Sequence, residues 1–438
     1  MSSFAKTSLP KKVPLTGSDC FHLVLDMHAK NYNAGSNVMR IAFYLNNTLT
    51  LYKTKKVFDN SPLIHWLCNV RLRQGRLFTI PFWQYKDRGN SMQLNEYRHP
   101  FVNEIPALVL QKDIPLDGER FVEGDIIHYP GNKSIFILSW NHIIMDGRGI
   151  GMLVQHLNDV ANGNVDHSIE HFFPAREKMT GLLSHIRNMY KVKAFIEKSS
   201  KAPISSIAGK KNLSTTSFNN SILHFTVSET KTIHDNAIQN GAKFGANLFY
   251  LSCCANAVHA IHKQRKKEGV MWIPVPYDGR LRGSLGPIIS NTVAFLFYRI
   301  PQQALVSTAQ TVTSLYNQMT EQMKDRMPQQ YGMLLNMMRH IPLRLYYFLV
   351  NKRGEGSFAS FLYSSTGENF NAIKSLFGES VQDLTIFPSP TFPPGLTFSF
   401  LKHQDALNIN IAYTPDVVNN FELSTIELTL KNLLLGKS

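Results

Sequence analysis

The clearest pattern in the chain is a continuous apolar run from Ile135 to Trp140, followed by a polar turn and a helical repeat. Such an unbroken run predicts a strand that is buried on both faces. The strand is expected to end at Asn141 and His142, and Asp146 and Gly147 follow in the turn. Beyond the turn, apolar residues recur at helical spacing and predict a helix with one buried face: Ile150, Leu153, Val154, Leu157 and Val160.

The remaining chain mixes helical and strand-like patterns, which is typical of the α/β class. Helices are expected at 18–28, 50–70 and 245–267. Strands are expected at 37–48, 222–227, 396–400 and 407–413. The last helix is expected to run through Leu433, with Thr414 as its N-cap and Pro415 in its first turn.

Length and composition favour a globular protein with two lobes. The chain has 438 residues, which is long for one hydrophobic core. Its hydrophobic share of 43% and charged share of 18% exclude a disordered chain. The stretch 203–220 is rich in Ser, Asn, Lys and Thr, as linkers are. We therefore expect an N-terminal lobe at 1–202, a crossover linker at 203–220 and a C-terminal lobe at 221–438.

The net charge of +15 favours anionic partners. Suitable partners are a phosphate-bearing cosubstrate, an acidic carrier protein or an anionic membrane surface. Basic residues cluster at 191–211 and 263–267, and a merely solvated surface would explain these clusters equally well. No recognition motif for nucleic acid accompanies the charge, so nucleic acid is not expected as a partner.

Cysteine usage and the start of the chain indicate a cytoplasmic protein. The four cysteines, at positions 20, 68, 253 and 254, include no C-x-x-C pair. Reduced thiols in the cytosol are therefore expected. Met1 to Pro14 lacks the apolar segment of a secretory signal.

His142 is the first candidate for chemistry, because histidine can take up a proton near neutral pH and a strand end can present it in a cavity. A lone histidine beside an apolar strand can equally be structural. His167 and His171 are spaced for one helix face, but no third ligand and no H-E-x-x-H motif accompany them. Neither a metal nor a permanently bound cofactor is therefore expected.

The H-x-x-x-D-G pattern from His142 to Gly147 resembles the signature of the chloramphenicol acetyltransferase-like superfamily. This group includes peptide-synthetase condensation domains, plant alcohol acyltransferases (BAHD-like) and wax ester synthases. The resemblance implies a two-lobed α/β fold, each lobe a mixed sheet with helices, and an active-site tunnel between the lobes. It also implies that His142 is the general base, while Asp146 and Gly147 are structural. Many members have a histidine where this chain has Asn141.

Two further segments carry weaker parts of the same resemblance. Asp278 to Arg282, with Ser290–Asn291 after it, resembles a second superfamily motif whose arginine pairs with the motif aspartate. We therefore expect Arg280, with Arg282 as the second choice, to bind Asp146. The resemblance places Asn291 toward the tunnel, and Asn141 and Ser365 are further candidates for binding substrate or the oxyanion. Leu15 to Asp26 resembles the opening segment of wax ester synthase-like proteins, which with the alcohol acyltransferases are the expected nearest relatives.

The segment from Leu334 to Arg353 is strongly apolar but is interrupted by Arg339, Pro342 and Arg344, so it is not expected to span a membrane. It can be a core helix or an interfacial helix with cations beside its aromatic residues. The second alternative would place the protein at a membrane surface and favours a long-chain or lipid-like substrate.

The resemblance implies an acyltransferase that moves an acyl group from an acyl-CoA or acyl carrier protein thioester to a hydroxyl or amine. The acceptor would attack directly, since the chain has no G-x-S-x-G motif for a serine nucleophile. Lipid or secondary-metabolite biosynthesis would be the setting. Two alternatives remain: a binding or epimerising protein with the same fold, and an unrelated two-lobed α/β protein in which His142 is structural.

Overall fold

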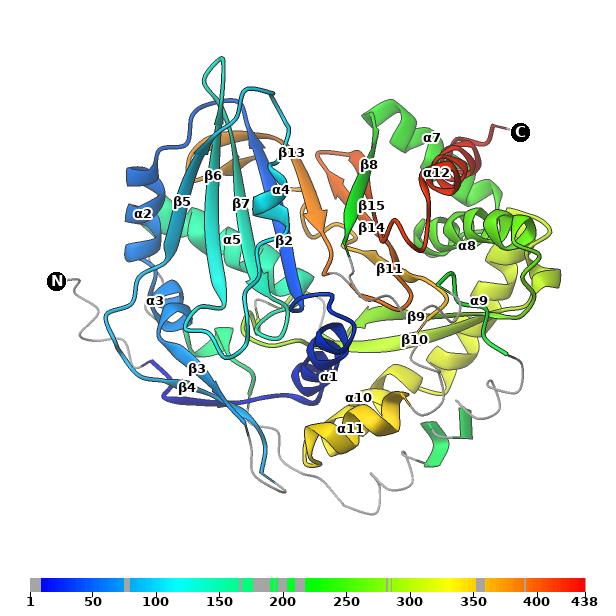
Figure 1. Ribbon diagram of the computed structural model, residues 1–438, viewed down its shortest axis with the longest axis horizontal. Helices are drawn as coiled ribbons and strands as arrows, with labels where there is room; N and C mark the ends of the chain where they lie inside the picture. The colour runs from blue at the N-terminus through cyan, green and yellow to red at the C-terminus, as the bar shows by residue number, and fades with distance from the viewer. Residues whose placement is uncertain are drawn as a thin grey trace.

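The computed structural model describes residues 9–74, 79–164, 168–175, 190–192, 194–195, 203–208, 217–280, 283–284, 286–351, 359–389 and 391–437. In these ranges the chain forms two lobes that lie side by side, each a β-sheet with helices packed on it (Figure 1). This is the two-lobed α/β fold expected from the sequence.

The first lobe is built on a six-stranded sheet in the order β12-β13-β2-β7-β6-β5. Neighbouring strands are antiparallel except β5 and β6, which are parallel. The bounds are β2 (Val38–Leu45), β5 (Gln93–Arg98), β6 (Val122–Tyr129), β7 (Lys133–Asn141), β12 (Ser375–Leu376) and β13 (Glu379–Phe387). β7 is buried along nearly its whole length, as the apolar run predicts. β12 and β13 belong to the range expected for the C-terminal lobe, yet they complete the sheet of the first lobe. Residues 375–387 therefore cross the expected boundary between the lobes.

Helices cover this sheet on both faces. Residues of α2 (Leu51–Asp59), α3 (Pro62–Cys68) and α5 (Gly147–Ala161) share the larger core, and α4 (Ala107–Leu110) packs on the opposite face. The single helix expected at 50–70 is wrong, because the chain breaks between α2 and α3. Ser61 caps α3 by accepting a hydrogen bond from the Ile64 backbone N–H, and Pro62 begins it. A small sheet joins β1 (Lys12–Pro14), β4 (Phe82–Tyr85) and β3 (Val70–Arg73).

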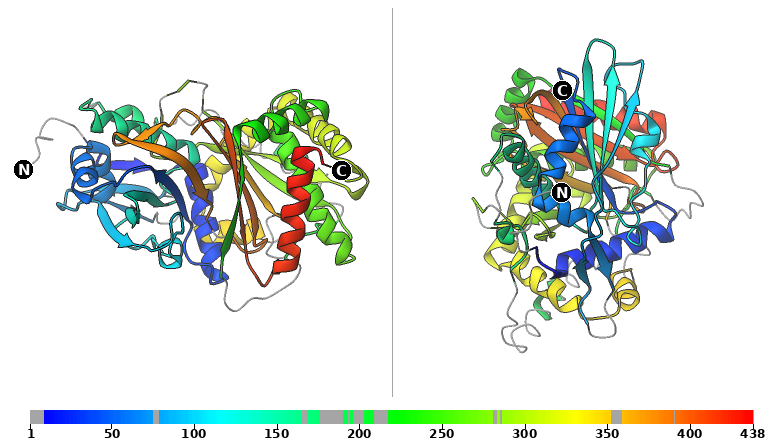
Figure 2. Two further views of the ribbon diagram at one scale, coloured as in Figure 1. Left: turned by 90° about the horizontal axis from the view of Figure 1, so that it is seen from above. Right: turned by 90° about the vertical axis from the view of Figure 1, so that its left-hand side faces the viewer.

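The second lobe has a four-stranded sheet in the order β11-β14-β15-β8. Its strands are β8 (Asn219–Phe225), β11 (Leu362–Ser365), β14 (Leu396–His403) and β15 (Ala406–Tyr413). Its helices are α7 (Val227–Gln239), α8 (Asn247–Gln264), α9 (Thr308–Lys324) and α12 (Asn420–Leu435). Seen from above in Figure 2, α12 and its neighbours lie on the side of this sheet away from the first lobe.

The strands β9 (Met271–Asp278) and β10 (Val293–Ile300) form an antiparallel pair that belongs to the core of the second lobe. Single-turn 3-10 helices occur at η2 (Glu170–Phe172) and η3 (Gln302–Ala304). Of the expected linker 203–220, the structure describes 203–208 and 217–220, and the last two residues already belong to β8. The stretch 203–208 is mostly buried, and Ile204 pairs with Val270. That part is packed into the second lobe and is not a free linker.

Three helices lie along one side of the molecule: α1 (Gly17–Asn31), α10 (Met327–Met338) and α11 (Leu343–Asn351). The backbone of α10 passes so close to Gly17 that a Cβ there would lie 2.3 Å from Leu335 and Asn336 backbone atoms. α11 buries Tyr346 but exposes Leu345, Phe348 and Leu349. It is therefore a surface helix that exposes several apolar side chains, not a core helix. Among the described residues, no helix is long and apolar enough to cross a membrane.

Two helix boundaries differ from the sequence prediction. The last helix begins at Asn420 with Asn419 as its N-cap, so the assignment of Thr414 as N-cap was wrong. The Asn419 side chain accepts from the Glu422 backbone N–H, and the Glu422 carboxylate accepts from that of Asn419, which is a reciprocal cap. α8 covers a shorter range than the 245–267 expected.

Candidate active site

The strand β7 carries His142 to the junction of the lobes. Where β2 and β7 pair, Val38 lies opposite Asn141. One residue beyond Asn141, His142 donates its backbone N–H to the Asn37 carbonyl at 2.7 Å. The turn that follows is bridged to the other lobe, because Met145 pairs with Ser290. The histidine backbone is thus held from both sides.

Asp146 fixes the turn by capping α5 and by pairing with Arg280. Its Oδ1 accepts from the Gly149 backbone N–H at 2.8 Å, and its Oδ2 accepts from the Thr292 backbone N–H at 2.9 Å. Oδ2 also lies 2.8 Å from Nη1 of Arg280, and both side chains are buried. The structure therefore contains the ion pair expected from the sequence; Arg282 lies outside the described residues. With three partners, the Asp146 carboxylate is structurally engaged.

The Arg280 guanidinium is also fully engaged. Its Nε and Nη2 donate to the Pro287 carbonyl at 3.2 and 2.9 Å, and Nη1 also lies 3.4 Å from the Asp278 carboxylate. Arg148 pairs with the other oxygen of Asp278. These contacts join the turn of the first lobe to the loop between β9 and β10. Arg280 is placed to hold the site together rather than to bind substrate.

Asn291 reaches the histidine turn, but its donors are occupied. Its Nδ2 lies within 2.9 to 3.1 Å of the carbonyl oxygens of His142 and Ile143 and the Asp19 carboxylate. Its backbone N–H donates to the same Asp19 oxygen at 2.6 Å. Its Nδ2 is therefore engaged within the protein, and the expected role of Asn291 toward substrate stays a prediction. This side chain holds the backbone on which His142 sits.

Asn141 is likewise a structural residue. Its side chain is fully buried, donates from Nδ2 to the Ile114 carbonyl at 2.9 Å and accepts from the Ile143 N–H at 3.2 Å. Ser365 is the last residue of β11 and pairs with Phe400 of β14. No contact among the described residues joins Ser365 to His142, so its role stays a prediction.

The two glycines of the turn differ in their surroundings. A Cβ on Gly147 would meet no atom within 4 Å, whereas a Cβ on Gly149 would lie 2.7 Å from the Ile288 carbonyl oxygen. Close packing therefore requires glycine at position 149, not at Gly147 as the sequence motif suggested. Open space lies in front of Gly147, one residue beyond Asp146.

The imidazole of His142 keeps one nitrogen accessible. Nδ1 is shielded from solvent and makes no hydrogen bond of normal geometry, while the side chain as a whole is partly exposed. The carbonyl groups of His142 and Met145 and the side chain of Asn291 are close enough to favour the protonated ring. Burial outweighs them, so the pKa of His142 is lowered from its ordinary value. His142 is thus a neutral imidazole, and Nε2 is its less shielded nitrogen.

Sequence reasoning missed three residues around this base. His22, on α1, stacks on His142 with ring centroids 4.0 Å apart and planes inclined by 25°. Asn37 contacts both histidines, because its side chain lies 3.2 Å from Nδ1 of His22 and its carbonyl binds His142. Asp19 accepts a hydrogen bond from the backbone N–H of Thr16, the N-cap of α1, and also binds Asn291. The only hint was that 15–26 resembles the opening segment of wax ester synthase-like proteins, which assigns no role to these side chains.

The remaining candidates can be placed as follows. His171 lies exposed on η2, and His167 is outside the described residues. Within the described ranges, no group of three His, Cys, Asp or Glu side chains could hold a metal ion. The cysteines at 20, 68, 253 and 254 are buried thiols, none of them bonded to another cysteine.

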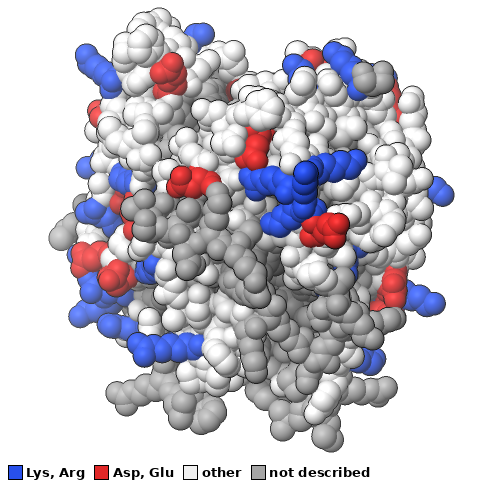
Figure 3. All heavy atoms as spheres, turned by 45° about the vertical axis from the view of Figure 1, so that its right-hand side comes forward, with Lys and Arg blue, Asp and Glu red and all other residues white. Residues whose placement is uncertain are grey.

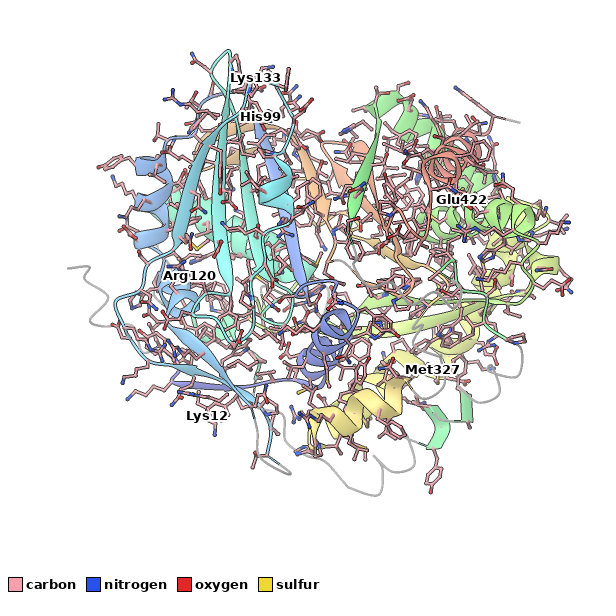
Figure 4. All side chains as sticks on the ribbon, in the orientation of Figure 1. Lys12, His99, Arg120, Lys133, Met327 and Glu422 are labelled. Carbon is pink, nitrogen blue, oxygen red and sulfur yellow. The ribbon has the colours of Figure 1, made fainter. Side chains whose placement is uncertain are left out.

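The basic cluster at 263–267 is partly structural. Arg265 donates to both oxygens of Glu422 at 2.7 Å and to the Ile207 carbonyl at 2.8 Å, and Lys267 donates to the Ser206 carbonyl. Glu422, labelled in Figure 4, lies on the first turn of α12. Lys263 and Lys266 are exposed. Figure 3 shows Lys and Arg side chains in several places on the face it draws, including a group near its centre with acidic side chains next to it. Most of the cluster at 191–211 lies outside the described residues.

Solved structures with the same fold cover nearly the whole chain. The trichothecene 15-O-acetyltransferase TRI3 from Fusarium sporotrichioides superposes with a TM-score of 0.70 at 14% identity, covering 97% of this chain and 95% of that one. The first condensation domain of the CDA synthetase gives 0.67 at 13%, covering 97% and 96%. The epimerization domain of TycB3 gives 0.61 at 11%, covering 99% and 98%.

These superpositions show that the chain has the same two-lobed fold as condensation domains and this trichothecene acetyltransferase. At these identities they establish the fold alone. No protein-family model matches the chain, and no curated protein matches it in sequence. The expected nearness to wax ester synthases and alcohol acyltransferases therefore stays a prediction.

Proposed function

We propose that this protein is an acyltransferase that moves an acyl group from a thioester to a hydroxyl or amine. The observation that carries the proposal is the state of His142: a neutral imidazole with Nε2 accessible, at the end of a buried strand where the two lobes meet. A base near neutral pH must be unprotonated and must be within reach of the acceptor. The donor would be acyl-CoA or an acyl carrier protein, as a cosubstrate.

In this mechanism Nε2 of His142 removes the proton from the acceptor hydroxyl or amine as its oxygen or nitrogen attacks the thioester carbonyl carbon. The carbonyl π electrons move to oxygen and form a tetrahedral oxyanion. When the oxyanion collapses, the carbon–sulfur bond breaks and the thiolate takes the proton from His142. The products are the ester or amide and the free thiol, and no acyl-enzyme is formed.

The residues around His142 would hold this geometry without taking part in proton transfer. Asp146 is occupied by Gly149, Thr292 and Arg280 and therefore fixes the turn. Asn291 ties the carbonyl of His142 to the other lobe. Because these contacts link both lobes at one point, substrates entering between the lobes would meet the imidazole. A tunnel between the lobes is part of this proposal.

Support also comes from the range of activities named for proteins with this fold. A trichothecene 15-O-acetyltransferase and a condensation domain both have it, which supports a transferase. An epimerization domain has it as well, which supports the second candidate, a protein that keeps the fold without transferring acyl groups. The replacement of the first motif histidine by Asn141, which is wholly buried, favours that candidate.

The experiment is to incubate the purified chain with short- and long-chain acyl-CoAs and a panel of alcohols and amines, and to measure free thiol and acylated product. Acyl transfer predicts thiol release that needs the acceptor and yields equal amounts of ester or amide. Thiol release without any acceptor indicates hydrolysis. No release from CoA or from a loaded carrier protein, with binding retained, would favour the binding or epimerising alternative.

We further propose a cytoplasmic location, with attachment to an anionic membrane surface through α11. The exposed Leu345, Phe348 and Leu349 lie on one face of this helix, beside the exposed Arg344. The sequence from Arg326 to Asn351 contains no acidic residue. Apolar side chains flanked by cations suit such a surface and would bring the protein to long-chain substrates.

A further inference from the structure

His22 is an unusual neighbour for a general base, because it is a second imidazole packed face to face on the first. The ring centroids of His22 and His142 are 4.0 Å apart. His22 is only 6% exposed, and it comes from α1, which is far from β7 in the sequence. A phenylalanine would fill the same space without the loss of hydration that a buried imidazole suffers. The ring nitrogens of His22 therefore call for an explanation.

Asn37 determines which nitrogen of His22 carries the proton. The amide Nδ2 of Asn37 lies 3.2 Å from Nδ1 of His22, and an amide nitrogen can only donate. Nδ1 must therefore accept, which leaves the proton on Nε2. Asn37 is itself held, since its backbone N–H donates to Asp26 at 3.1 Å and its carbonyl accepts from His142 at 2.7 Å. One residue thus sets both the tautomer of His22 and the position of His142.

The Nε2–H of His22 is left without a partner. No hydrogen bond from it occurs among the described residues, and this nitrogen is not one of the fully shielded polar atoms. Burial and the neighbouring His142 lower the pKa of His22 well below its ordinary value, so the ring stays neutral. The site therefore contains a neutral N–H donor, fixed in direction, next to a neutral base.

Acyl transfer needs such a donor, because the tetrahedral oxyanion must be stabilised. Two of the donors expected from the sequence are used elsewhere: the Nδ2 atoms of Asn141 and Asn291 bind backbone carbonyls. Ser365 belongs to the second lobe and has no contact with the histidine pair among the described residues. His22 is the neutral side-chain donor that the structure places against His142.

We propose that His22 is a second catalytic residue, whose Nε2–H donates a hydrogen bond to the carbonyl oxygen of the acyl group as it becomes an oxyanion. This inference rests on the proposed acyl transfer. The attacking atom bound to His142 and the developing oxyanion share one carbon, so they are closer together than the two stacked rings. Two hydrogen bonds of about 2.8 Å converging from rings 4.0 Å apart fit that arrangement.

The test compares His22→Phe with His22→Gln in the acyl-transfer assay. Phenylalanine keeps a flat ring against His142 but removes the donor, whereas glutamine restores an N–H. We expect His22→Phe to lower kcat by about 10²–10³-fold with little change in KM, and His22→Gln to recover part of the loss. His156→Phe is the matched control, because His156 is buried to the same degree in the same lobe and lies outside the site. Its kcat should stay near the wild-type value.

Thermal unfolding of each variant shows whether it is folded, and nitrogen NMR of ¹⁵N-histidine-labelled protein shows whether His22 is protonated at Nε2. A folded His22→Phe variant with wild-type kcat, or a proton found on Nδ1 of His22, would overturn the inference while leaving acyl transfer intact. Failure of the wild type to release thiol with any donor and acceptor would instead overturn the proposed function and the oxyanion role together.

Discussion

Arg280 and Asp146 form an ion pair of 2.8 Å between the two lobes, and their side chains are only 1% and 4% exposed. The carboxylate also accepts two backbone N–H groups, and the guanidinium also binds the Pro287 carbonyl. A buried charge with all of its partners present is stable, but removing one partner leaves the other charge unpaired in the interior. The pair therefore fixes the histidine turn only as long as both members are present.

Replacing Arg280 by Met should destabilise the protein by about 3–5 kcal/mol, because the Asp146 carboxylate would remain buried without a cation. The free energy of unfolding can be measured by urea denaturation. Lys231→Ala, which breaks the exposed pair with Asp235, is the control and should cost at most about 0.5 kcal/mol. Equal effects of the two substitutions would mean that the buried pair is not required for the fold.

Alanine should destabilise the protein at Gly149 but not at Gly147. At Gly149 the new Cβ would lie 2.7 Å from the Ile288 carbonyl, so we expect a loss of about 1–3 kcal/mol in unfolding free energy. At Gly147 no atom lies within 4 Å, and the substitution should leave the melting temperature unchanged. If the space before Gly147 receives substrate, Gly147→Ala should raise KM. A destabilised Gly147→Ala variant would contradict this description of the turn.

The pH dependence of kcat/KM should follow His142. Burial lowers its pKa from the ordinary value of 6.5, so the ring stays unprotonated at neutral pH and gains its proton only in more acidic solution. Because the base must be free, kcat/KM should be constant around pH 7 and fall below pH 6.5. A profile already falling as the pH drops from 8 to 7 would show that the limiting base has a raised pKa and is another group.

Asp19 should contribute more to stability in acidic solution than at neutral pH. Burial raises its pKa to about 6, although N–H groups of Asn291 and Thr16 bind it. At pH values between the raised pKa in the native state and the lower pKa in the unfolded chain, Asp19 is protonated in the native state but not in the unfolded chain. This group therefore adds stability as the pH falls from about 6 toward 4. The unfolding free energy of the wild type, taken relative to that of Asp19→Asn, should therefore be higher at pH 4 than at pH 7. An unchanged difference would show that Asp19 does not titrate in this range.

The sequence predicted the features that depend on local pattern. The apolar run became β7, and the repeat after Gly147 became α5, since burial alone specifies both. The pairing of Arg280 with Asp146 was also expected, because a family pattern marks both residues. Two residues that lie far apart in the sequence can be paired in this way only where a known family motif already marks both.

Other features could not be predicted because they depend on tertiary contacts. His22 looks like an ordinary helical residue until α1 is placed beside β7, and Asn37 looks like the first residue of a strand. The role of Asn291 depends on which carbonyl groups lie near its amide, and the folded arrangement alone decides that. β13 joins the first sheet through backbone hydrogen bonds, which most residue types can form, so the sequence does not reveal its neighbouring strand.

The most direct test of the account is the rate of acceptor-dependent thiol release by His142→Ala compared with the wild type. A general base contributes about 10²–10⁴-fold, so the variant should lose activity by that factor while its melting curve still shows a folded protein. A folded His142→Ala variant that transfers acyl groups at the wild-type rate would contradict the role assigned to this imidazole and the mechanism built on it.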